Sequence, residues 1–223
     1  MAGEGVETTE IGTGIRYLCF CLVSPGTGKK YCRWRAKTQE TPKARSEVQL
    51  GAEWGTWGRL NYAEVAQTNN GQYRSFGEVA SFNNATLTNS PAGWLANAAV
   101  VYRWNGSAWS NCRDSGFYFS PSAWATFGLT WSFGTPPCGD GFYFTNNYGF
   151  VWDGGSWRGN PSGIWSGYIS WVGCLSCLAA ATTPPPRGPP PTKMKRPAPP
   201  ASQRAAATVP AGLIVQGGPA GAR

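Results

Sequence analysis

The chain has 223 residues, with 30 Gly, 18 Pro, 12 Trp and no His, and its formal net charge is +8. The absence of histidine excludes a Ser-His-Asp triad, a Cys-His dyad and any imidazole metal ligand. No apolar run approaches the roughly 20 residues that a transmembrane helix needs, so the sequence predicts no transmembrane segment.

Charge and composition divide the chain into three regions. Residues 1–50 hold eight Lys or Arg and five Glu, residues 51–173 hold five Arg and six acidic residues, and residues 174–223 hold six Lys or Arg and no acid. Eleven of the twelve Trp fall in the middle region. We therefore expect an irregular basic N-terminal segment that is partly ordered at best, a β-rich aromatic domain, and a disordered tail rich in Pro, Ala and Arg.

The N-terminal segment has two features that admit more than one interpretation. The apolar run at residues 17–23 fits a buried strand or a truncated signal-peptide core. Over residues 29–37, Lys and Arg alternate with Tyr31 and Trp34, a pattern that suits contacts with phosphates and stacked bases. The same pattern is typical of a solvated strand edge. We favour this second interpretation, so no specific nucleic-acid partner is predicted.

Two segments of the middle region repeat one pattern. Residues 102–109 and 150–157 each contain an aromatic residue, a Trp two positions later, then Asn-Gly or Asp-Gly, a Ser and a second Trp. Asn-Gly and Asp-Gly favour the type I′ turn of a tight β-hairpin, because both central residues need a positive φ. We expect two hairpins in which Gly106 and Gly154 adopt a positive φ as the second central residues.

The rest of the middle region also has the pattern of strands. Apolar and polar residues alternate over residues 125–133, and this period of two predicts a half-buried strand. No stretch of ten residues shows a capped helical period. The predicted fold is therefore all-β, a small antiparallel β-sandwich or barrel of aromatic-rich hairpins.

The seven cysteines suggest a disulfide and a compartment. Cys112 and Cys138 hold equivalent positions before two Gly-Phe-Tyr-Phe segments, so we expect them to form a disulfide with Cα atoms about 4.4–6.8 Å apart. A disulfide and the Asn-, Gly- and Thr-rich composition favour a secreted or cell-surface protein. A zinc site is the alternative, although its spacing is irregular, and no metal or cofactor is predicted. The cysteines of that alternative are Cys19 or Cys21, Cys32, Cys174 and Cys177.

The C-terminal tail has the composition of a solvated segment. Residues 182–223 contain eleven of the 18 Pro, which interrupt both helices and sheet ladders. The tail offers little apolar surface to offset the entropy of ordering. Its PPPRGPPP stretch favours an extended polyproline II shape. The alternatives to a plain tail are a basic arm for nucleic acid or anionic lipid and a ligand of a Pro-binding domain.

Four tryptophans are the candidate ligand-binding residues. Trp104, Trp109, Trp152 and Trp157 flank the two predicted turns, which favours exposure, and flat aromatic rings can stack on sugar rings. The alternative is that these side chains fill the core of a Gly-rich sheet. The two hairpins resemble the aromatic hairpin repeats of bacterial cell-wall and carbohydrate-binding modules over two eight-residue stretches, and no binding residues carry over from that resemblance.

Catalysis has few candidates. Glu53, Glu64 and Glu78 are the carboxylates of the middle region that turn geometry does not explain. A glycosidase needs two carboxyl groups about 5–9.5 Å apart, and nothing in the sequence pairs any two of these, so no catalytic residue is predicted.

The sequence therefore predicts a secreted, non-enzymatic β-domain that binds a glycan or cell-surface polymer through exposed aromatic residues. One alternative is a structural or assembly protein, such as a coat or appendage subunit with a disordered basic arm. The other is a small glycan hydrolase. The sequence leaves the oligomeric state open.

Overall fold

The computed structural model describes residues 7–11, 15–23, 30–37, 44–54, 57–67, 72–83, 89–171, 193–200 and 209–218. The chain divides into two compact units, Met1–Thr41 and Pro42–Arg223. The described residues contain β-strands and no α-helix, as the sequence predicts.

The first unit contains a three-stranded antiparallel sheet. Its strands are β1 (Glu7–Ile11), β2 (Ile15–Val23) and β3 (Lys30–Lys37), in that order. The apolar run at residues 17–23 lies within β2, and most of the basic-aromatic cluster lies in β3. The segment that we expected to be partly ordered at best therefore contains this sheet.

The second unit contains a five-stranded sheet. Its strands are β4 (Ala44–Trp54), β5 (Trp57–Gln67), β6 (Tyr73–Asn83), β10 (Thr126–Phe133) and β15 (Leu213–Gly218). They follow the order β15-β10-β6-β5-β4, and every pairing is antiparallel.

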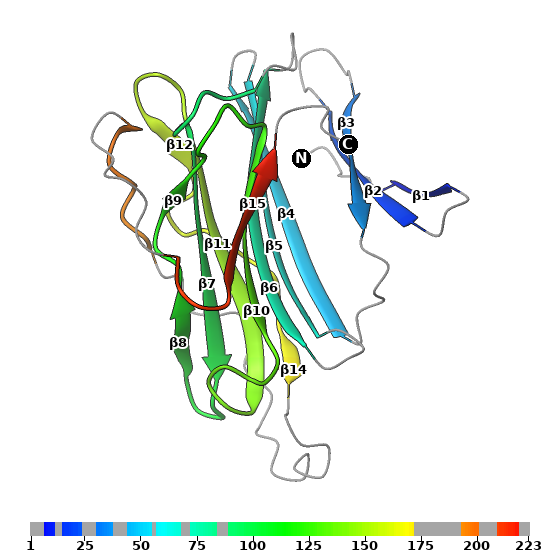
Figure 1. The fold of residues 1–223 in the computed structure, drawn as a ribbon, viewed down its shortest axis with the longest axis vertical. Coiled ribbons are helices and arrows are strands. Elements are labelled where there is room, and N and C mark those ends of the chain that lie inside the picture. Colours follow the sequence, from blue (N-terminus) through cyan, green and yellow to red (C-terminus); the bar gives the residue numbers. More distant parts are fainter. Residues whose placement is uncertain are drawn as a thin grey trace. The chain divides into compact units, whose positions relative to one another are not determined.

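A seven-stranded antiparallel sheet completes this unit. Its strands are β7 (Leu95–Trp104), β8 (Trp109–Asp114), β9 (Tyr118–Phe119), β11 (Gly141–Trp152), β12 (Trp157–Gly159), β13 (Ile164–Trp165) and β14 (Ile169–Trp171). The long strands β7 and β11 form its centre, and the short strands pair with one or the other. Figure 1 shows the two sheets of the second unit face to face, with β7 and β11 in one layer and β10, β6, β5 and β4 in the other. This open arrangement corresponds to the predicted antiparallel sandwich.

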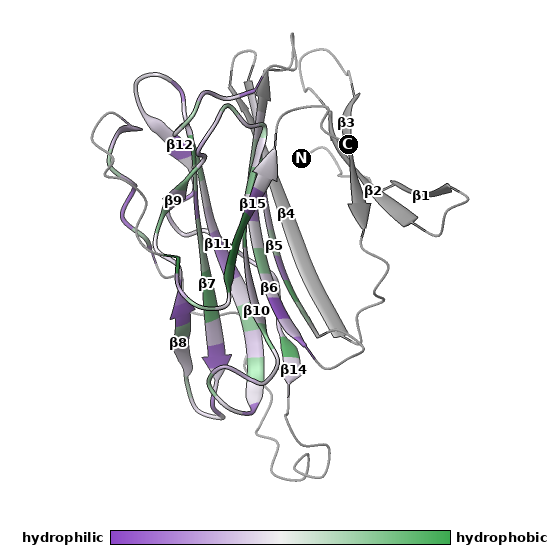
Figure 2. Ribbon diagram, in the orientation of Figure 1, coloured by the Kyte–Doolittle hydropathy of each residue, from purple (hydrophilic) through white to green (hydrophobic). Residues whose placement is uncertain are grey.

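The apolar core lies between the two sheets. In β7, Leu95, Ala99 and Val101 belong to the same buried cluster as Phe127 and Leu129 of β10. These two β10 residues are fully buried on the inward face, as predicted. Gly128 and Thr130 of the other face are buried as well, so the strand is not half-buried as the alternation predicted. The Trp131 indole Nε1, also from β10, donates a hydrogen bond to the Ala99 carbonyl oxygen at 2.9 Å and so joins the two sheets. Figure 2 shows the hydrophobic residues along the middle of β7 and hydrophilic ones toward its C-terminal end.

A polar layer also links the sheets, and we call it the interlock: Asn61, Gly77, Asn97, Asn147 and Gly149. The Asn147 Nδ2 donates to Asn61 Oδ1 at 2.8 Å, and the Asn97 Nδ2 donates to the Gly77 carbonyl at 2.8 Å. A Cβ on Gly77 would overlap the Asn147 side chain, and one on Gly149 would overlap that of Asn61. Each glycine therefore makes the space that an asparagine of the opposite sheet fills.

The C-terminal region differs from the predicted disordered tail. Leu213–Gly218 forms β15 and pairs with β10, with Leu213 opposite Trp131. Residues 193–200 also lie on the domain, where Met194 packs against a buried cluster. The physical reason for β15 is local, since its sequence LIVQGG has no Pro and begins with an apolar run that includes the β-branched Ile214 and Val215. Of the predicted tail, residues 174–192, 201–208 and 219–223 lie outside the described residues.

Candidate functional site

The outer face of the seven-stranded sheet is lined with aromatic side chains. Side chains alternate along a strand. Five aromatic residues of β11 therefore point away from the five-stranded sheet: Phe142, Phe144, Tyr148, Phe150 and Trp152. Neighbouring strands add further rings at one end of this face, beside the β7–β8 hairpin. We call this group the hairpin-end aromatic cluster, and its members are Tyr102, Trp104, Trp109, Phe142, Phe144, Trp165 and Tyr168.

Phe144 lies at the centre of the hairpin-end aromatic cluster. The Tyr102 ring stacks on it with centroids 4.8 Å apart and an interplanar angle of 5°. The Trp109 ring meets Phe144 edge-on at 4.6 Å, and the Trp165 ring does so at 6.0 Å. These distances are those of favourable aromatic pairs, so the contacts stabilise this arrangement of the rings.

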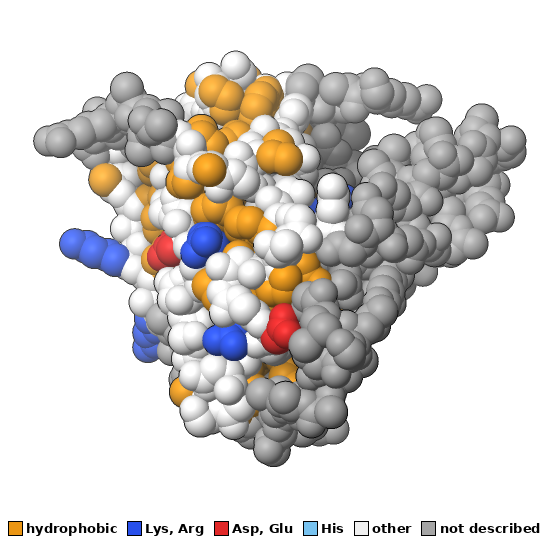
Figure 3. All heavy atoms as spheres, turned by 60° about the horizontal axis from the view of Figure 1, so that its bottom comes forward, with side chains coloured by type: hydrophobic (Ala, Val, Ile, Leu, Met, Phe, Trp, Pro, Cys, Tyr) orange, Lys and Arg blue, Asp and Glu red, His pale blue; other side chains and the backbone are white. Residues whose placement is uncertain are grey.

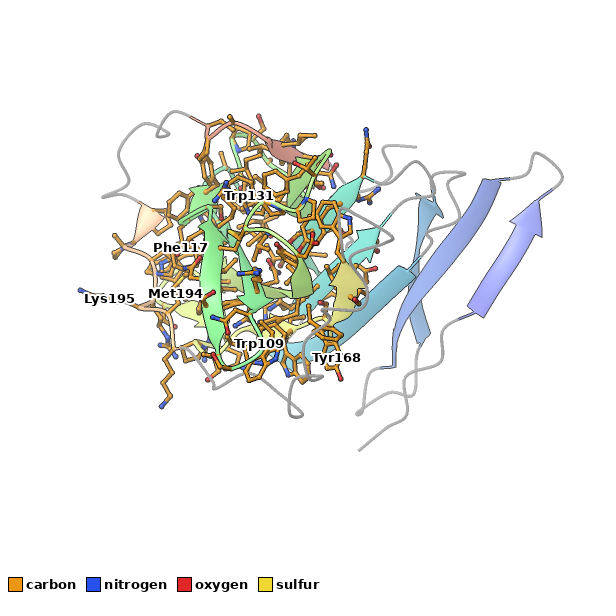
Figure 4. The ribbon with its side chains drawn as sticks, turned by 90° about the horizontal axis from the view of Figure 1, so that it is seen from below. Trp109, Phe117, Trp131, Tyr168, Met194 and Lys195 are labelled. Atoms are coloured by element: carbon orange, nitrogen blue, oxygen red, sulfur yellow. A yellow bond between two sulfur atoms is a disulfide. The ribbon has the colours of Figure 1, made fainter. Side chains whose placement is uncertain are left out.

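Two members of the cluster are exposed to solvent. Trp165 is 39% exposed and Tyr168 is 36% exposed. Tyr168 lies against Phe142 at 5.5 Å and against Trp109 at 6.3 Å, so it lies over the other rings. Figure 4 shows Trp109 and Tyr168 close together at this end of the molecule. The cluster thus presents two rings to solvent on a packed aromatic base.

The four predicted tryptophans form two facing pairs, one in each hairpin. Trp104 and Trp109 are Cα partners with ring centroids 5.6 Å apart, and Trp152 and Trp157 are partners at 5.3 Å. Trp104 is only 8% exposed and Trp157 only 4%. The expected exposure of these two was wrong, because paired residues point to one sheet face, which other aromatic rings cover. Trp109 and Trp152 are half-buried.

Sequence reasoning missed Trp165 and Tyr168. Trp165 is the last residue of β13, and Tyr168 lies between β13 and β14, directly after Gly167. The two-residue strand β13 is too short to show a period of two. The available signal was two large aromatic residues in a Gly- and Ser-rich connection, where a core role is unusual.

Gly106 and Gly154 have positive φ, 103° and 97°, as predicted. The register of the turns differs from the prediction. Because Trp104 pairs with Trp109 and the Asn105 N–H bonds the Ala108 carbonyl, the chain reverses one residue later than expected. Gly106 is therefore the first, rather than the second, residue at the centre of its turn.

A side-chain oxygen closes each turn. In the second hairpin, Asp153 Oδ1 accepts hydrogen bonds from the N–H groups of Gly155 at 3.0 Å and Ser156 at 2.7 Å. Asn105 Oδ1 has the same role in the first hairpin, with the N–H groups two and three residues onward. Asn and Asp are favoured here because their side chains can bond the backbone of a turn in this way.

The charge of Asp153 makes the stability of the second hairpin depend on pH. The backbone N–H groups of Ser156 and Gly155, with the Arg158 side chain, lower the pKa of Asp153 from 3.8 to about 2. A lowered folded-state pKa contributes stability that is present above the unfolded pKa and is lost as the pH falls through the folded one.

We expect the Asp153→Asn variant to remove this part of the acid sensitivity while keeping the turn, since Asn105 closes the equivalent turn. Urea unfolding between pH of about 5 and 2 should show a stability difference between wild type and variant that shrinks as the pH falls. The Asp153→Ala variant, which lacks the acceptor, should be less stable than both at pH of about 5. An unchanged pH slope in the Asn variant would contradict the assignment.

The predicted disulfide is present. Cys112 of β8 is bonded to Cys138 in the loop before β11, with Cα atoms 5.9 Å apart. The same loop is held by Arg103, whose Nε and Nη2 donate to the Asp140 carbonyl at 2.9 and 2.6 Å. The Tyr143 hydroxyl donates to the Gly139 carbonyl, and burial raises the pKa of this hydroxyl, so it keeps its proton. The disulfide therefore ties an edge strand to a loop that polar contacts also hold.

The glutamates of the predicted hydrolase alternative lie on the five-stranded sheet. Glu64 is 6% exposed, and its Oε2 accepts a hydrogen bond from the Tyr62 hydroxyl at 2.6 Å. Its Oε1 lies 4.0 Å from Arg74 Nη2. Glu78 is on the neighbouring strand opposite Tyr62. The side chain of Glu53 lies outside the described residues.

Two further findings concern the described residues alone. No group of three or more Cys, Asp or Glu is placed to hold a metal ion there. The side chains of the zinc alternative, Cys19, Cys21, Cys32, Cys174 and Cys177, lie outside the described part of the chain. Within the ranges given above, no helix has the length and apolarity needed to cross a membrane.

Comparison with known proteins adds no identification. No family model, no curated protein and no solved structure matches the chain.

Proposed function

We propose that this chain is a non-enzymatic β-domain that binds a glycan or cell-surface polymer through the hairpin-end aromatic cluster. The observation that carries the proposal is the exposure of Trp165 and Tyr168 above a packed base of rings. Two exposed rings on a base of buried and half-buried rings form an apolar patch, and such a patch favours a binding surface.

The chemistry of the cluster suits a sugar ring better than a polyanion. None of its seven members carries a charge at neutral pH. Asn111 and Ser170, the Cα partners of Tyr102 and Phe142, are exposed beside the rings. Figure 3 shows this end of the molecule, with hydrophobic and uncharged side chains over most of the described surface and charged ones at separate places. Apolar ring faces flanked by hydroxyl and amide groups match the apolar and polar sides of a sugar.

The Cys112–Cys138 disulfide supports a location outside the cell or at its surface. Such bonds persist in oxidising compartments and are rare in the reducing cytosol.

The test is affinity gel electrophoresis of the full-length chain, in which binding to a polysaccharide in the gel slows migration. The polysaccharides are neutral and soluble, such as derivatives of cellulose, chitin or xylan. We expect Trp165→Ala and Tyr168→Ala each to weaken binding about tenfold, because a central aromatic contact is worth roughly 1–2 kcal/mol. The melting temperature should change little, since both side chains are partly exposed.

The Ile214→Ala variant is the matched control, since Ile214 is 52% exposed on β15, away from the cluster. It should bind as the wild type does. Equal retention of all three variants, or binding to none of the neutral polymers, would contradict the proposal.

The second candidate is a structural or assembly protein. The burial of Trp104 and Trp157 favours it, and so does the place of β15 at one end of its sheet with Ile214 exposed. An edge strand of this kind can pair with another chain. Concentration-dependent light scattering without any polysaccharide binding would favour this candidate over the first.

A further inference from the structure

The other half of the aromatic face is occupied by the chain itself. Residues 193–200, with the sequence KMKRPAPP, lie there. Met194 packs against the buried cluster that contains Trp157, together with Phe117, Phe119 and Trp152. Figure 4 shows Met194 beside Phe117 and Lys195 directed away from the sheet. This part of the face is already used for binding a peptide segment.

The burial of the segment has a period of three. Met194, Pro197 and Pro200 are half-buried, whereas all the residues between them are exposed. A polyproline II helix has three residues per turn, and Pro favours it by fixing φ. A polyproline II helix with one edge on the sheet would give this spacing, and Met194 is the residue seen packing there.

Two hydrogen bonds fix the segment on the domain. The Trp157 Nε1 donates to the Ala198 carbonyl at 3.1 Å, and the Met194 N–H donates to the Pro161 carbonyl at 2.8 Å. A polyproline II helix makes no internal hydrogen bonds, so its backbone groups are free for such contacts. Aromatic-lined grooves that bind Pro-rich segments use this preformed conformation.

We propose that Phe117, Phe119, Trp152 and Trp157 form a recognition site for polyproline II peptides with the spacing Met-x-x-Pro-x-x-Pro. Its occupant is the chain's own segment 193–200. The basic side chains of the segment, Lys193, Lys195 and Arg196, are exposed. Recognition therefore depends on the apolar residues at every third position rather than on charge. This site is separate from the hairpin-end aromatic cluster and does not depend on the proposed glycan binding.

The segment belongs to the same chain as its site, and this covalent link determines how strongly a free peptide can compete. A segment linked to its own site has an effective concentration on the order of millimolar, so it excludes a free peptide of similar affinity. Releasing the segment should open the site to the same sequence supplied from outside.

The experiment uses the full-length chain and a fluorescein-labelled peptide of residues 193–200, with binding followed by anisotropy. The released variant, Met194→Asp with Pro197→Asp, should bind the peptide at least about tenfold more tightly than the wild type. The control variant, Lys195→Asp with Arg196→Asp, introduces the same side chains at two exposed positions and should bind as the wild type does.

Two further arms test the chemistry of the site. Adding Trp157→Phe to the released variant removes the Nε1 donor and should weaken peptide binding about tenfold. The Trp157 indole proton should exchange slowly with deuterium in the wild type and rapidly in the released variant. This second readout does not depend on the peptide affinity.

Three results would overturn the proposal. These are equal peptide binding by the wild type and the released variant, equal binding of a scrambled peptide without the three-residue spacing, and fast exchange of the Trp157 indole proton in the wild type.

Discussion

Loss of the Cys112–Cys138 disulfide is expected to lower the free energy of unfolding by about 3 kcal/mol, as measured by urea denaturation of the Cys112→Ser, Cys138→Ser variant. The bond joins residues 26 positions apart, and a loop of this size restricts the unfolded chain by roughly that amount. For a domain of this size the melting temperature should fall by about 6–12 °C. The effect is large because Cys112 also belongs to the main buried cluster.

Reduction provides the control for this prediction. Dithiothreitol should destabilise the wild type by the same amount and should leave the double variant unchanged. A loss of less than about 1 kcal/mol in the variant would show that Arg103 and Tyr143 hold the Cys138 loop sufficiently without the bond.

The Gly77→Ala variant is expected to lose about 2–4 kcal/mol, because it breaks the interlock between the two sheets. The added Cβ would lie only 2.5 Å from Asn147 Cγ, so the asparagine must move. Overpacking of this kind costs roughly 1–3 kcal/mol. The displaced amide would also lose its buried bond to Asn61 Oδ1 at 2.8 Å and its part-buried bond to the Glu78 carbonyl at 3.2 Å.

Two comparisons separate the steric overlap with Asn147 from other effects of the Gly77→Ala substitution. Gly134→Ala makes the same chemical change where nothing lies within 4 Å of the new Cβ, and it should alter stability by less than about 0.5 kcal/mol. Combining Gly77→Ala with Asn147→Ala should cost less than the sum of the single changes, because the shortened side chain leaves more room. Strict additivity would contradict the steric explanation.

Local patterns in the sequence predicted much of the fold. The alternation of residues 125–133 identified the inward face of β10, and the Asn-Gly and Asp-Gly pairs identified the two hairpins and their positive-φ glycines. The Cys112–Cys138 bond followed from matching positions in a repeat. The turns and the strand face depend on neighbouring residues, and the two cysteines were matched through the local repeat that each one precedes.

Features that depend on distant parts of the chain were not predictable in this way. Nothing near Asn147 in the sequence indicates that its side chain fills the space left by Gly77. The burial of Trp104 depends on Trp109 and on rings from β11, and that of Trp157 depends on the cluster that Met194 covers. The exposure of Trp165 and Tyr168 likewise follows from the packing of β11 beneath them.

The place of β15 in its sheet has a consequence for the synthesis of the protein. Its partner strand β10 ends at Phe133, whereas β15 begins at Leu213. At translation rates of about 5–20 residues per second, the ribosome needs roughly 4–16 s to make the intervening stretch. During that interval the backbone groups of β10 that β15 will bond are free to pair with other nascent chains. Slow elongation through the Pro-rich stretch would prolong this period, so the yield of folded protein should depend on the translation rate.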